Sequence, residues 1–562
     1  MTPPKLMSCW KHLLVVGILS TAVCSGFAQA PVIGSANTAT ADPPVRHPNT
    51  TPCTVTLFSD FTFDDFSPRD FSYTPPASCP GPWAKVVLVA DFNENAGVQY
   101  DRTAKMFIGG VNVYFGTTPE PTSTLAPTWH IERDLTDYSA LLAQPQSGDI
   151  HLDNLVNSTY TGVIHGSAQL LFYPAAFSAP APRTADQVIA LPTGATDSTY
   201  LDTTSSQLSQ PVTLPANVEN AYLDVFAQGQ STDEFWYTCV PNADASTLQN
   251  CGSTAFRETE ITIDGQPAGV APIYPWIFTG GIDPNLWAPT PGVQTLDFVP
   301  YRVDLTPFAG VLSNGQPHTV ALSVFNADNY FAVTATLLVF QDHGSKSVTG
   351  AVTQNTLAAT PTPVIQAQGV SSSGGTINTY DLRNYRITGY ANTSHGRVET
   401  TVEQNINFTN AQQFTLSSTQ YEQGVAQGTE ISSDTTTKDG WFVSEKKKHL
   451  SYPLSLVYNY TVNADGSSQQ VTTVQQGFHQ YDENLLNGLL LYSSETRNAV
   501  NSDDTWLFNS SGVPTGTEGR SSSQKYFTHD STGYCYSRKL TSAAGLLTAV
   551  KDGEGCPRGQ NR

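Results

Sequence analysis

The sequence predicts an all-β protein made of several sandwich or jelly-roll domains. Short segments rich in β-branched and aromatic residues recur along the chain, separated by turns of Gly, Pro and Asn. Helical periodicity is nearly absent, and we expect only residues 134–142 to form a short helix or turn. Charged residues make up 13% of the 562 residues, which suits a β protein with many polar turns.

The strand signals fall into three regions, separated by stretches rich in Pro, Ala, Ser, Thr and Gly. Gly109-Gly110 lies between two strand signals and is typical of a tight hairpin turn. The strand signals are residues 85–91, 105–115 and 167–173, then 220–227, 260–264, 294–305, 319–325 and 331–340, and finally 396–408, 454–462 and 469–478. We expect a signal peptide over 1–30, a flexible leader over 31–52, a first β-sandwich over 53–175, a second over 187–345, a linker over 346–375 and a C-terminal β domain over 376–562.

The first thirty residues have the pattern of a secretory signal peptide. Lys5, Lys11 and His12 precede a short apolar run, and residues 28–30 (AQA) form a small-residue cleavage pattern. No later segment reaches the roughly eighteen apolar residues that a membrane-spanning helix needs. We therefore expect a secreted or periplasmic protein without stable membrane association, and a monomer.

Six cysteines follow the signal peptide, and an even number in an exported chain favours disulfides. The simplest pairing is local, because each pair then lies alone in its region. It joins Cys53 to Cys79, Cys239 to Cys251 and Cys535 to Cys556.

Charge and motifs narrow the function. The net charge of −21 argues against a nucleic-acid partner, which would need a basic face, and is compatible with work at low pH. The sequence contains no GxSxG, HExxH, P-loop or dinucleotide-binding motif. The remaining candidates are carboxylates that lie beside aromatic residues in loops.

Two acidic segments follow or precede predicted strands. In Tyr100-Asp101-Arg102, the arginine favours an ionised carboxylate that can act as a base or nucleophile, although a strand-edge salt bridge has the same pattern. In residues 233–237 (DEFWY), two acids adjoin three aromatics, which is typical of a sugar site and equally of a turn with a core tryptophan. Burial against Trp236 would raise the pKa of Glu234.

Two further segments carry acids. Glu258 and Glu260 alternate at the start of a strand, where a solvated sheet face is the simpler interpretation. Residues 280–287 (GGIDPNLW) form a loop with Asp283 and Trp287, which either lines a cleft or caps the sheet.

These segments together resemble the peptide-N-glycanases of the A type. The resemblance covers nearly the whole mature chain, and DEFWY and GGIDPNLW are its most specific patterns. The other matching stretches are NAYLDVFAQGQSTDEFWY, FRETEITIDG, IFTGGIDPNLW, YRVDLTPF, HTVALSVFNADNYF, QYDRTAKMFIGG, WHIERDLTDYSALLAQPQ, NLVNSTYTG, GYANTSHGRVETTVEQ and GYCYSRKLTS. The resemblance implies hydrolysis of the amide bond between the innermost N-acetylglucosamine and asparagine of N-glycosylated peptides and proteins. It also implies activity at acidic pH, with no metal or cofactor.

A weaker likeness reaches the bacterial F-type enzymes, which have an acidic site in the cleft between two jelly-roll domains. It implies two jelly-roll-like sandwiches side by side, followed here by the C-terminal β domain. The essential aspartate of a Trp-Asp-Arg motif matches Asp101, with Tyr100 in place of the tryptophan. A second acid matches Glu234, with Glu258 as the reserve candidate, and a third acid matches Asp153.

The resemblance implies a role for each candidate. Asp101 is expected to be the principal catalytic carboxylate, oriented by Arg102, while Glu234 contacts the first sugar or moves a proton. Expected substrate-binding residues are Asp153, Asp233, Trp236, Tyr237, Asp283 and Trp287, the three aromatics as walls of the sugar site. Two alternatives stay open, a secreted glycan-binding β protein that forms no product and a glycoside hydrolase that uses two carboxylates.

Overall fold

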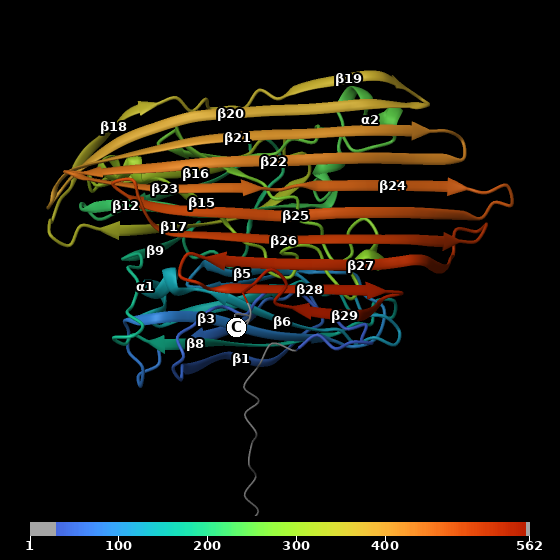
Figure 1. Cartoon of the computed structure of the whole chain (residues 1–562), viewed down its shortest axis with the longest axis horizontal. Helices are drawn as coiled ribbons and strands as arrows, with labels where there is room; N and C mark the ends of the chain where they lie inside the picture. Colours follow the sequence, from blue (N-terminus) through green and yellow to red (C-terminus); the bar gives the residue numbers. More distant parts are fainter. Residues whose placement is uncertain (1–29, 558–562) are drawn as a thin grey trace, which may run out of the picture.

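The computed structural model describes residues 30–557, and its strands form two β-sandwiches and one broad sheet (Figure 1). The predicted signal peptide lies almost wholly outside the described residues. In Figure 1 the broad sheet lies across the front of the view, and the first sandwich, in blue, lies at the bottom. No helix among residues 30–557 is long and apolar enough to cross a membrane.

The first sandwich is a jelly roll of eight antiparallel strands. One sheet contains, in spatial order, β1 (Cys53–Phe63), β8 (Ile164–Pro174), β3 (Trp83–Glu94) and β6 (Thr128–Asp134). The other contains β2 (Arg69–Tyr73), β7 (Gln146–Leu152), β4 (Thr103–Ile108) and β5 (Val111–Thr117). This strand order is that of two interleaved Greek keys. The expected hairpin at Gly109-Gly110 joins β4 to β5, and both glycines have positive φ, as a two-residue turn of this kind requires.

The second sandwich repeats the same topology. One sheet contains β10 (Thr199–Leu201), β17 (Tyr330–Gln341), β12 (Val218–Gln230) and β15 (Tyr301–Asp304), with β9 (Gln187–Leu191) also paired to β17. The other contains β11 (Gln207–Thr213), β16 (Pro317–Val324), β13 (Glu258–Ile263) and β14 (Gln266–Pro272). The two jelly rolls therefore have equivalent loops, and the site described below depends on this equivalence.

Short helices occupy matching positions in the two jelly rolls. The connection from β6 to β7 contains η1 (Thr136–Tyr138) and α1 (Ser139–Leu142), and that from β15 to β16 contains η5 (Thr306–Phe308) and α3 (Ala309–Leu312). Asp134 accepts a hydrogen bond from the Thr136 amide, and Asp304 accepts one from the Thr306 amide. The remaining helices are η2 (Ser231–Asp233), η3 (Trp236–Thr238), α2 (Asn242–Leu248) and η4 (Pro284–Trp287).

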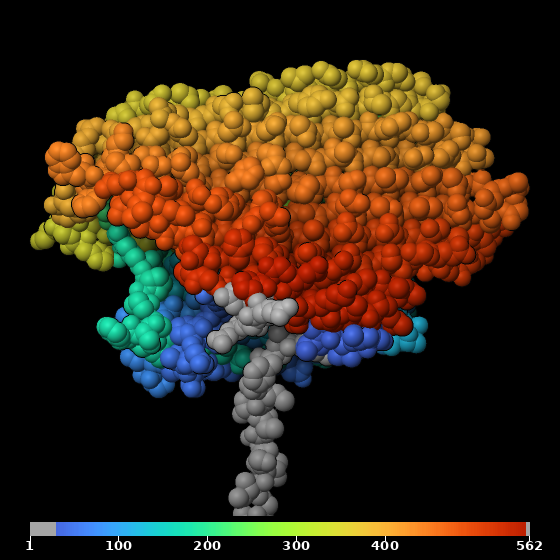
Figure 2. Space-filling view, in the orientation of Figure 1, coloured from blue at the N-terminus to red at the C-terminus, as the bar shows by residue number. Residues whose placement is uncertain are grey.

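The C-terminal region is a single sheet of twelve antiparallel strands. Its strands are β18 (Thr349–Asn355), β19 (Val364–Ser371), β20 (Gly374–Thr393), β21 (Gly396–Leu416), β22 (Gln420–Asp439), β23 (Phe442–Ser451), β24 (Leu454–Val462), β25 (Ser468–Leu486), β26 (Leu489–Phe508), β27 (Pro514–Asp530), β28 (Cys535–Ala543) and β29 (Leu546–Asp552). Residues along β20, β21 and β22 alternate between buried and exposed, so one face packs inward and the other is solvated. Figure 2 shows the first jelly roll, in blue, emerging beneath the red strands of this sheet.

The inward face of this sheet shares a core with the second jelly roll. Phe408 of β21 packs against Trp236 and Phe256, and Tyr452 packs edge-on against Tyr274. The buried apolar residues of the two parts form one continuous cluster. The broad sheet is therefore a structural support for the second jelly roll.

The structure corrects three predictions about secondary structure and order. Only residues 301–304 of the predicted strand 294–305 are extended in a sheet, as β15. The expected linker over 346–375 contains β18 and β19, which pair with β20. The linker prediction was wrong because a polar edge strand and a linker have similar compositions.

The expected flexible leader is docked. Residues 30–52 contain no strand or helix, but Ala39 and Ala41 are buried against Leu540 and Leu547. The Ala41 amide donates to the side chain of Gln524 on β27. Backbone hydrogen bonds also join Gly34 and Ser35 to Leu547. The leader is thus part of the folded protein.

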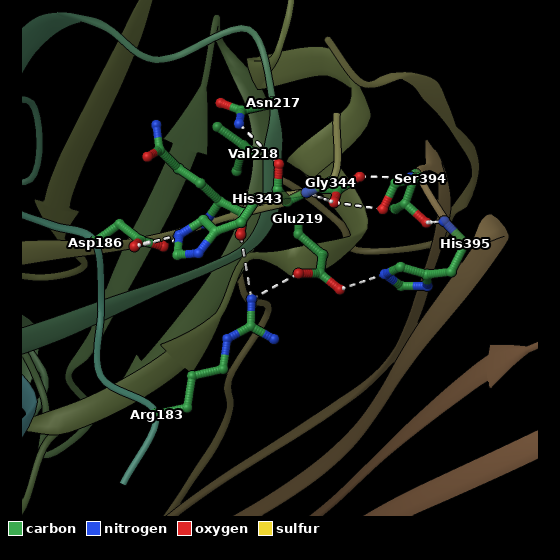
Figure 3. A network of polar contacts seen from close by, with 12 residues as sticks. Arg183, Asp186, Asn217, Val218, Glu219, His343, Gly344, Ser394 and His395 are labelled. Atoms are coloured by element: carbon green, nitrogen blue, oxygen red, sulfur yellow. Dashed lines mark hydrogen bonds and ion pairs between the residues drawn. The ribbon is translucent and has the colours of Figure 1, made fainter. Parts of the chain in front are cut away.

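A polar network joins residues 183–186, which precede β9, to the second jelly roll and the C-terminal sheet (Figure 3). Arg183 donates to Glu219, whose other oxygen lies 3.3 Å from His395 Nε2 in the β20–β21 turn. His343 Nε2 lies 2.7 Å from Asp186 Oδ1. The network fixes the junction between the three parts.

The three disulfides are those of the predicted local pairing. Cys53 is bonded to Cys79, Cys239 to Cys251, and Cys535 to Cys556. The middle disulfide closes the loop after DEFWY and so restrains the segment that carries Glu234.

Candidate active site

Asp101 lies in the connection between β3 and β4, two residues before β4 begins. Its carboxyl group is mostly buried, and burial raises its pKa above the ordinary value, while the Gly280 amide and the nearby Arg102 charge oppose that rise. Arg102 does not form the expected ion pair with this carboxylate. It donates instead to the Asp101 carbonyl and, at 2.6 Å, to the Gln99 side chain.

Glu120, in the connection after β5, is the immediate neighbour of Asp101. Its Oε1 accepts a hydrogen bond from the Asp101 amide, with an N–O distance of 3.3 Å. Burial and the Asp101 charge raise the pKa of Glu120 to about 7. Two carboxyl groups held side by side in this way disfavour double ionisation, because like charges repel in a partly dehydrated site.

Glu234 comes from the second jelly roll, just after β12. Burial and the Asp101 charge raise the pKa of Glu234 to about 8, so this group carries its proton at acidic and neutral pH. The Tyr237 hydroxyl is buried without a hydrogen-bond partner among residues 30–557, and the charge of Glu234 adds to the rise of its pKa.

Gly280 and Gly281 lie directly against the carboxyl groups of Asp101, Glu120 and Glu234. A Cβ on Gly280 would lie 2.4 Å from both Asp101 Oδ1 and Glu120 Oε1, and a Cβ on Gly281 would lie 3.3 Å from Glu234 Oε1. A side chain at Gly280 would therefore displace one of the two acids. This close approach gives the GGIDPNLW segment a physical reason for its paired glycines.

Glu94, at the end of β3, is a fourth acid behind the first three. It is fully buried, and neither of its oxygens has a hydrogen-bond partner in the described part of the chain. Burial raises the pKa of Glu94 to about 8, against the effect of Arg102. Arg102 thus supplies positive charge to Glu94, Asp101 and Glu120 together.

The C-terminal sheet holds the backbone of the segment that follows Glu234. The side-chain amides of Asn410, Gln412 and Gln423 each donate, at 2.9 Å, to one carbonyl of residues 237–239. Asn410, Gln412 and Gln423 are also linked to one another or to Gln427 by hydrogen bonds. This ladder fixes the position of the segment from which Glu234 projects.

Two of the predicted acids are buried beside arginines. Glu258, the reserve candidate, is buried 3.1 Å from Arg383 of the C-terminal sheet. Asp233 is fully buried in an ion pair with Arg257 and accepts hydrogen bonds from the amides of residues 328 and 329. The structure does not bring either carboxylate beside Asp101.

The predicted sugar walls are core residues in this structure. Trp236, Tyr237 and Trp287 are 3%, 0% and 3% exposed, so their rings have no open face for a sugar to stack on. Asp283 is also buried, and it caps the helix η4 through the Asn285 amide. The pattern of acids beside aromatics was ambiguous, and here it marks a packed turn.

Tyrosines adjoin two of the acids, since Tyr100 precedes Asp101 and the charge of Glu234 acts on Tyr330. Tyr100 is 56% exposed and packs against Tyr160, and Tyr200 is 49% exposed and packs edge-on against Tyr330. Burial raises the pKa of Asp153, and the positive charges of Lys105 and Arg102 lower it. The charge of Asp153 in turn acts on Tyr200 and Tyr330.

Sequence reasoning missed Glu94, Glu120 and the tyrosines other than Tyr100. Glu120 stands between Pro119 and Pro121, a local pattern with no recognised catalytic meaning. Its one available signal was position, because it follows a buried strand at the same end of the sandwich as Asp101.

The acids that the two jelly rolls bring together favour one type of chemistry. Carboxyl groups with raised pKa values that lie close together suit acid–base hydrolysis. A family model described as peptide N-acetyl-beta-D-glucosaminyl asparaginase amidase A matches residues 42–358, more than half of the chain. The chain therefore belongs to this family of amidases.

The chain is also similar to one curated protein and to several solved structures. The chain is 27% identical over 536 residues to peptide-N4-(N-acetyl-beta-glucosaminyl)asparagine amidase A of Prunus dulcis, covering 91% of this chain and 92% of the relative. Among solved structures, PNGase F of Flavobacterium meningosepticum is 14% identical with a TM-score of 0.35, covering 52% of this chain and 96% of its own. PNGF-II is 13% identical with a TM-score of 0.36, covering 52% and 66%.

Proposed function

We propose that this enzyme hydrolyses the amide bond between the innermost N-acetylglucosamine and asparagine of N-glycosylated peptides and proteins. The observation that carries the proposal is the meeting of Asp101 and Glu234, from different jelly rolls, at Gly280-Gly281. Membership of the amidase family supports the choice of bond.

The two acids divide the proton transfers. Water attacks the side-chain carbonyl carbon of the substrate asparagine, and the ionised Asp101 takes the proton that the water loses. Glu234, still protonated, gives its proton to the leaving nitrogen as the carbon–nitrogen bond breaks. The products are an aspartate-containing peptide and a glycosylamine, which then loses ammonia in water.

Arg102 and the exposed tyrosines complete the site. The positive charge of Arg102, whose Nε lacks a hydrogen-bond partner among the described residues, opposes the negative charge that develops on the carbonyl oxygen. Tyr100 and Tyr160 offer an open aromatic face for the first sugar. We assign contacts with the next part of the glycan to Asp153 and Tyr330, because the charge of Asp153 acts on Tyr330.

The proposal includes an acidic working range. Activity requires protonated Glu234, whose pKa is about 8, and ionised Asp101, whose pKa is raised from 3.8. Activity is therefore lost at high pH, where Glu234 gives up its proton, and at low pH, where Asp101 becomes protonated. The disulfides support action outside the cytosol.

A glycopeptide with one N-glycan tests the reaction directly, with the products read by mass from acidic to neutral pH. The proposal predicts a peptide in which asparagine has become aspartate, together with an intact glycan. A peptide that keeps one N-acetylglucosamine would indicate a glycoside hydrolase, and an unchanged but bound glycopeptide would indicate a binding protein. Either result would contradict the proposal.

A further inference from the structure

Asp101 and Glu120 form a close pair beside Gly280. Asp101 Oδ1 and Glu120 Oε1 lie within 2.4 Å of the same point beside Gly280, so they are no further apart than twice that distance. The Glu120 oxygen also accepts the Asp101 amide hydrogen. This separation allows the carboxyl groups to exchange a hydrogen bond directly or through one water molecule.

Backbone contacts on all sides hold the pair in place. The Arg102 amide donates to Thr118 Oγ1 and the Thr118 amide donates to the Arg102 carbonyl, which ties the segment of Glu120 to that of Asp101. The Thr279 hydroxyl, from the second jelly roll, donates to the Thr118 carbonyl. These contacts hold the backbone segments of the two acids side by side.

The charged groups that face Glu120 are few. Asp101 and Arg102 come from the connection between β3 and β4, and Glu94 comes from the end of β3. The segment of Glu120 itself, residues 118–127, contains no other titratable residue, and neither do residues 278–282 opposite. Arg102 is therefore the one positive charge among the described groups that act on Glu120.

We propose that Glu120 is a positioning residue that keeps one proton and donates it as a hydrogen bond to the Asp101 carboxylate. This role rests on the proposed function, and it explains why a second carboxyl group lies beside the catalytic one. A protonated Glu120 stabilises ionised Asp101 without adding charge. An ionised Glu120 would repel the ionised Asp101 and could no longer donate a hydrogen bond to it, so that Asp101 would lose its orientation toward the attacking water.

The proton on Glu120 is not consumed in the reaction. Asp101 takes the proton of water and Glu234 supplies that of the leaving nitrogen, while Glu120 keeps its proton through the whole cycle. The raised pKa of Glu120, about 7, agrees with this role, because the group is then protonated throughout the acidic range. Loss of this proton is expected to set the upper pH limit of activity, below the limit of about 8 that Glu234 would set.

The test compares Glu120→Gln and Glu120→Ala with the wild type, with Glu518→Gln on the exposed part of β27 as a matched control. Glutamine keeps a neutral hydrogen-bond donor and has no proton to lose, whereas alanine removes the hydrogen bond. The kcat/KM values for a glycopeptide are measured across pH, and thermal unfolding shows whether each variant is folded.

The proposal predicts that Glu120→Gln stays active at acidic pH and that its upper pH limit moves from about 7 toward about 8. Glu120→Ala is expected to lose about a hundredfold in activity at every pH, because the orientation of Asp101 is lost. An unchanged upper limit in Glu120→Gln would overturn the proposal, and so would equal activities of the two variants at acidic pH. If the wild type itself leaves the amide intact, the proposed function fails, and the role of Glu120, which rests on it, fails as well.

Discussion

The two jelly rolls share a topology but use the same loops differently. The connection from the third to the fourth strand holds Asp101 in the first jelly roll and Asp233-Glu234 in the second. The connection after the fifth strand holds Glu120 in the first and Gly280-Gly281 in the second. The first jelly roll thus contributes two closely spaced acids, while the second contributes one acid and the glycines that make room for them.

The difference lies in how each acid is compensated. Asp233 is fully paired with Arg257 and two backbone amides, so it fixes the loop. Asp101, Glu120 and Glu234 have no ion-pair partner among residues 30–557, and their pKa values are raised. These equivalent loops therefore provide both a rigid frame and a group of poorly compensated carboxyls, and carboxyls of the second kind suit acid–base chemistry.

The largest effect on activity is expected when a side chain is added at Gly280. Gly280→Ala would place a methyl group 2.4 Å from both Asp101 and Glu120, which forces one of them to move. A loss of about a hundredfold or more in kcat/KM is expected, because small displacements of reacting groups have effects of this size. Gly424→Ala, where a Cβ meets nothing within 4 Å, is the control and should leave activity unchanged. A fully active Gly280→Ala protein would show that the two acids do not meet there during catalysis.

The next effect concerns stability in the second jelly roll. Asp233→Asn leaves the buried Arg257 without its counter-charge, and breaking a buried ion pair in this way costs about 3–5 kcal/mol. Denaturant unfolding measures the change in the free energy of unfolding. A loss below about 1 kcal/mol, the range of an exposed pair, would contradict the assignment of Asp233 as a frame residue.

The pH dependence of stability follows from the uncompensated acids. The folded-state pKa values of Glu94, Glu120 and Glu234 are about 8, 7 and 8, above their ordinary value of 4.5. The folded protein therefore binds more protons than the unfolded chain, so these groups reduce stability as the pH rises from about 4.5 toward 8. Groups with a lowered pKa, such as Asp342, act in the opposite sense only below about their ordinary value of 3.8.

Thermal unfolding across this range checks the sign. A lower melting temperature at pH 8 than at pH 5 is expected, and Glu94→Gln should reduce the difference, since glutamine has no proton to release. A melting temperature that increases steadily toward pH 8 would mean that these carboxyls are compensated in the folded state.

The smallest effect is expected at the edge of the site. Tyr100→Ala removes an aromatic face that is 56% exposed and is not in contact with any of the acids through a hydrogen bond of its side chain. A several-fold rise in KM with little change in kcat is expected, because the ring contributes binding alone. Tyr380→Ala on the C-terminal sheet is the control. If kcat falls as much as KM rises, Tyr100 takes part in the chemistry.

Much of the fold could be predicted from local signals. The run over 85–91 lies within β3, and Gly109-Gly110 forms the turn where it was expected, because strand alternation and turn chemistry are local properties. The three disulfides were predictable from their isolation in sequence. The docking of residues 30–52 was not, since it depends on contacts with β27 and β29, about 500 residues away along the chain.

The site was predictable in part, for a similar reason. Resemblance proposed Asp101 and Glu234 as site residues, and the structure brings both to the same glycine pair. Trp236 and Trp287 could not be assigned correctly, because an aromatic residue next to an acid is equally consistent with a binding wall and with a core turn. Glu120 could be recognised only in the structure, because its proposed role depends on Asp101, which a different connection brings beside it.

Asp101→Asn tests the central claim most directly, when activity on a glycopeptide and thermal unfolding are measured on the same sample. The side chain keeps its shape but can no longer accept a proton, so a loss of about 10²–10⁴-fold in kcat/KM is expected. Because burial and neighbouring acids disfavour the charge of Asp101, the melting temperature should stay the same or increase. An Asp101→Asn protein that removes the glycan at the wild-type rate, or one that loses activity only because it unfolds, would contradict the account.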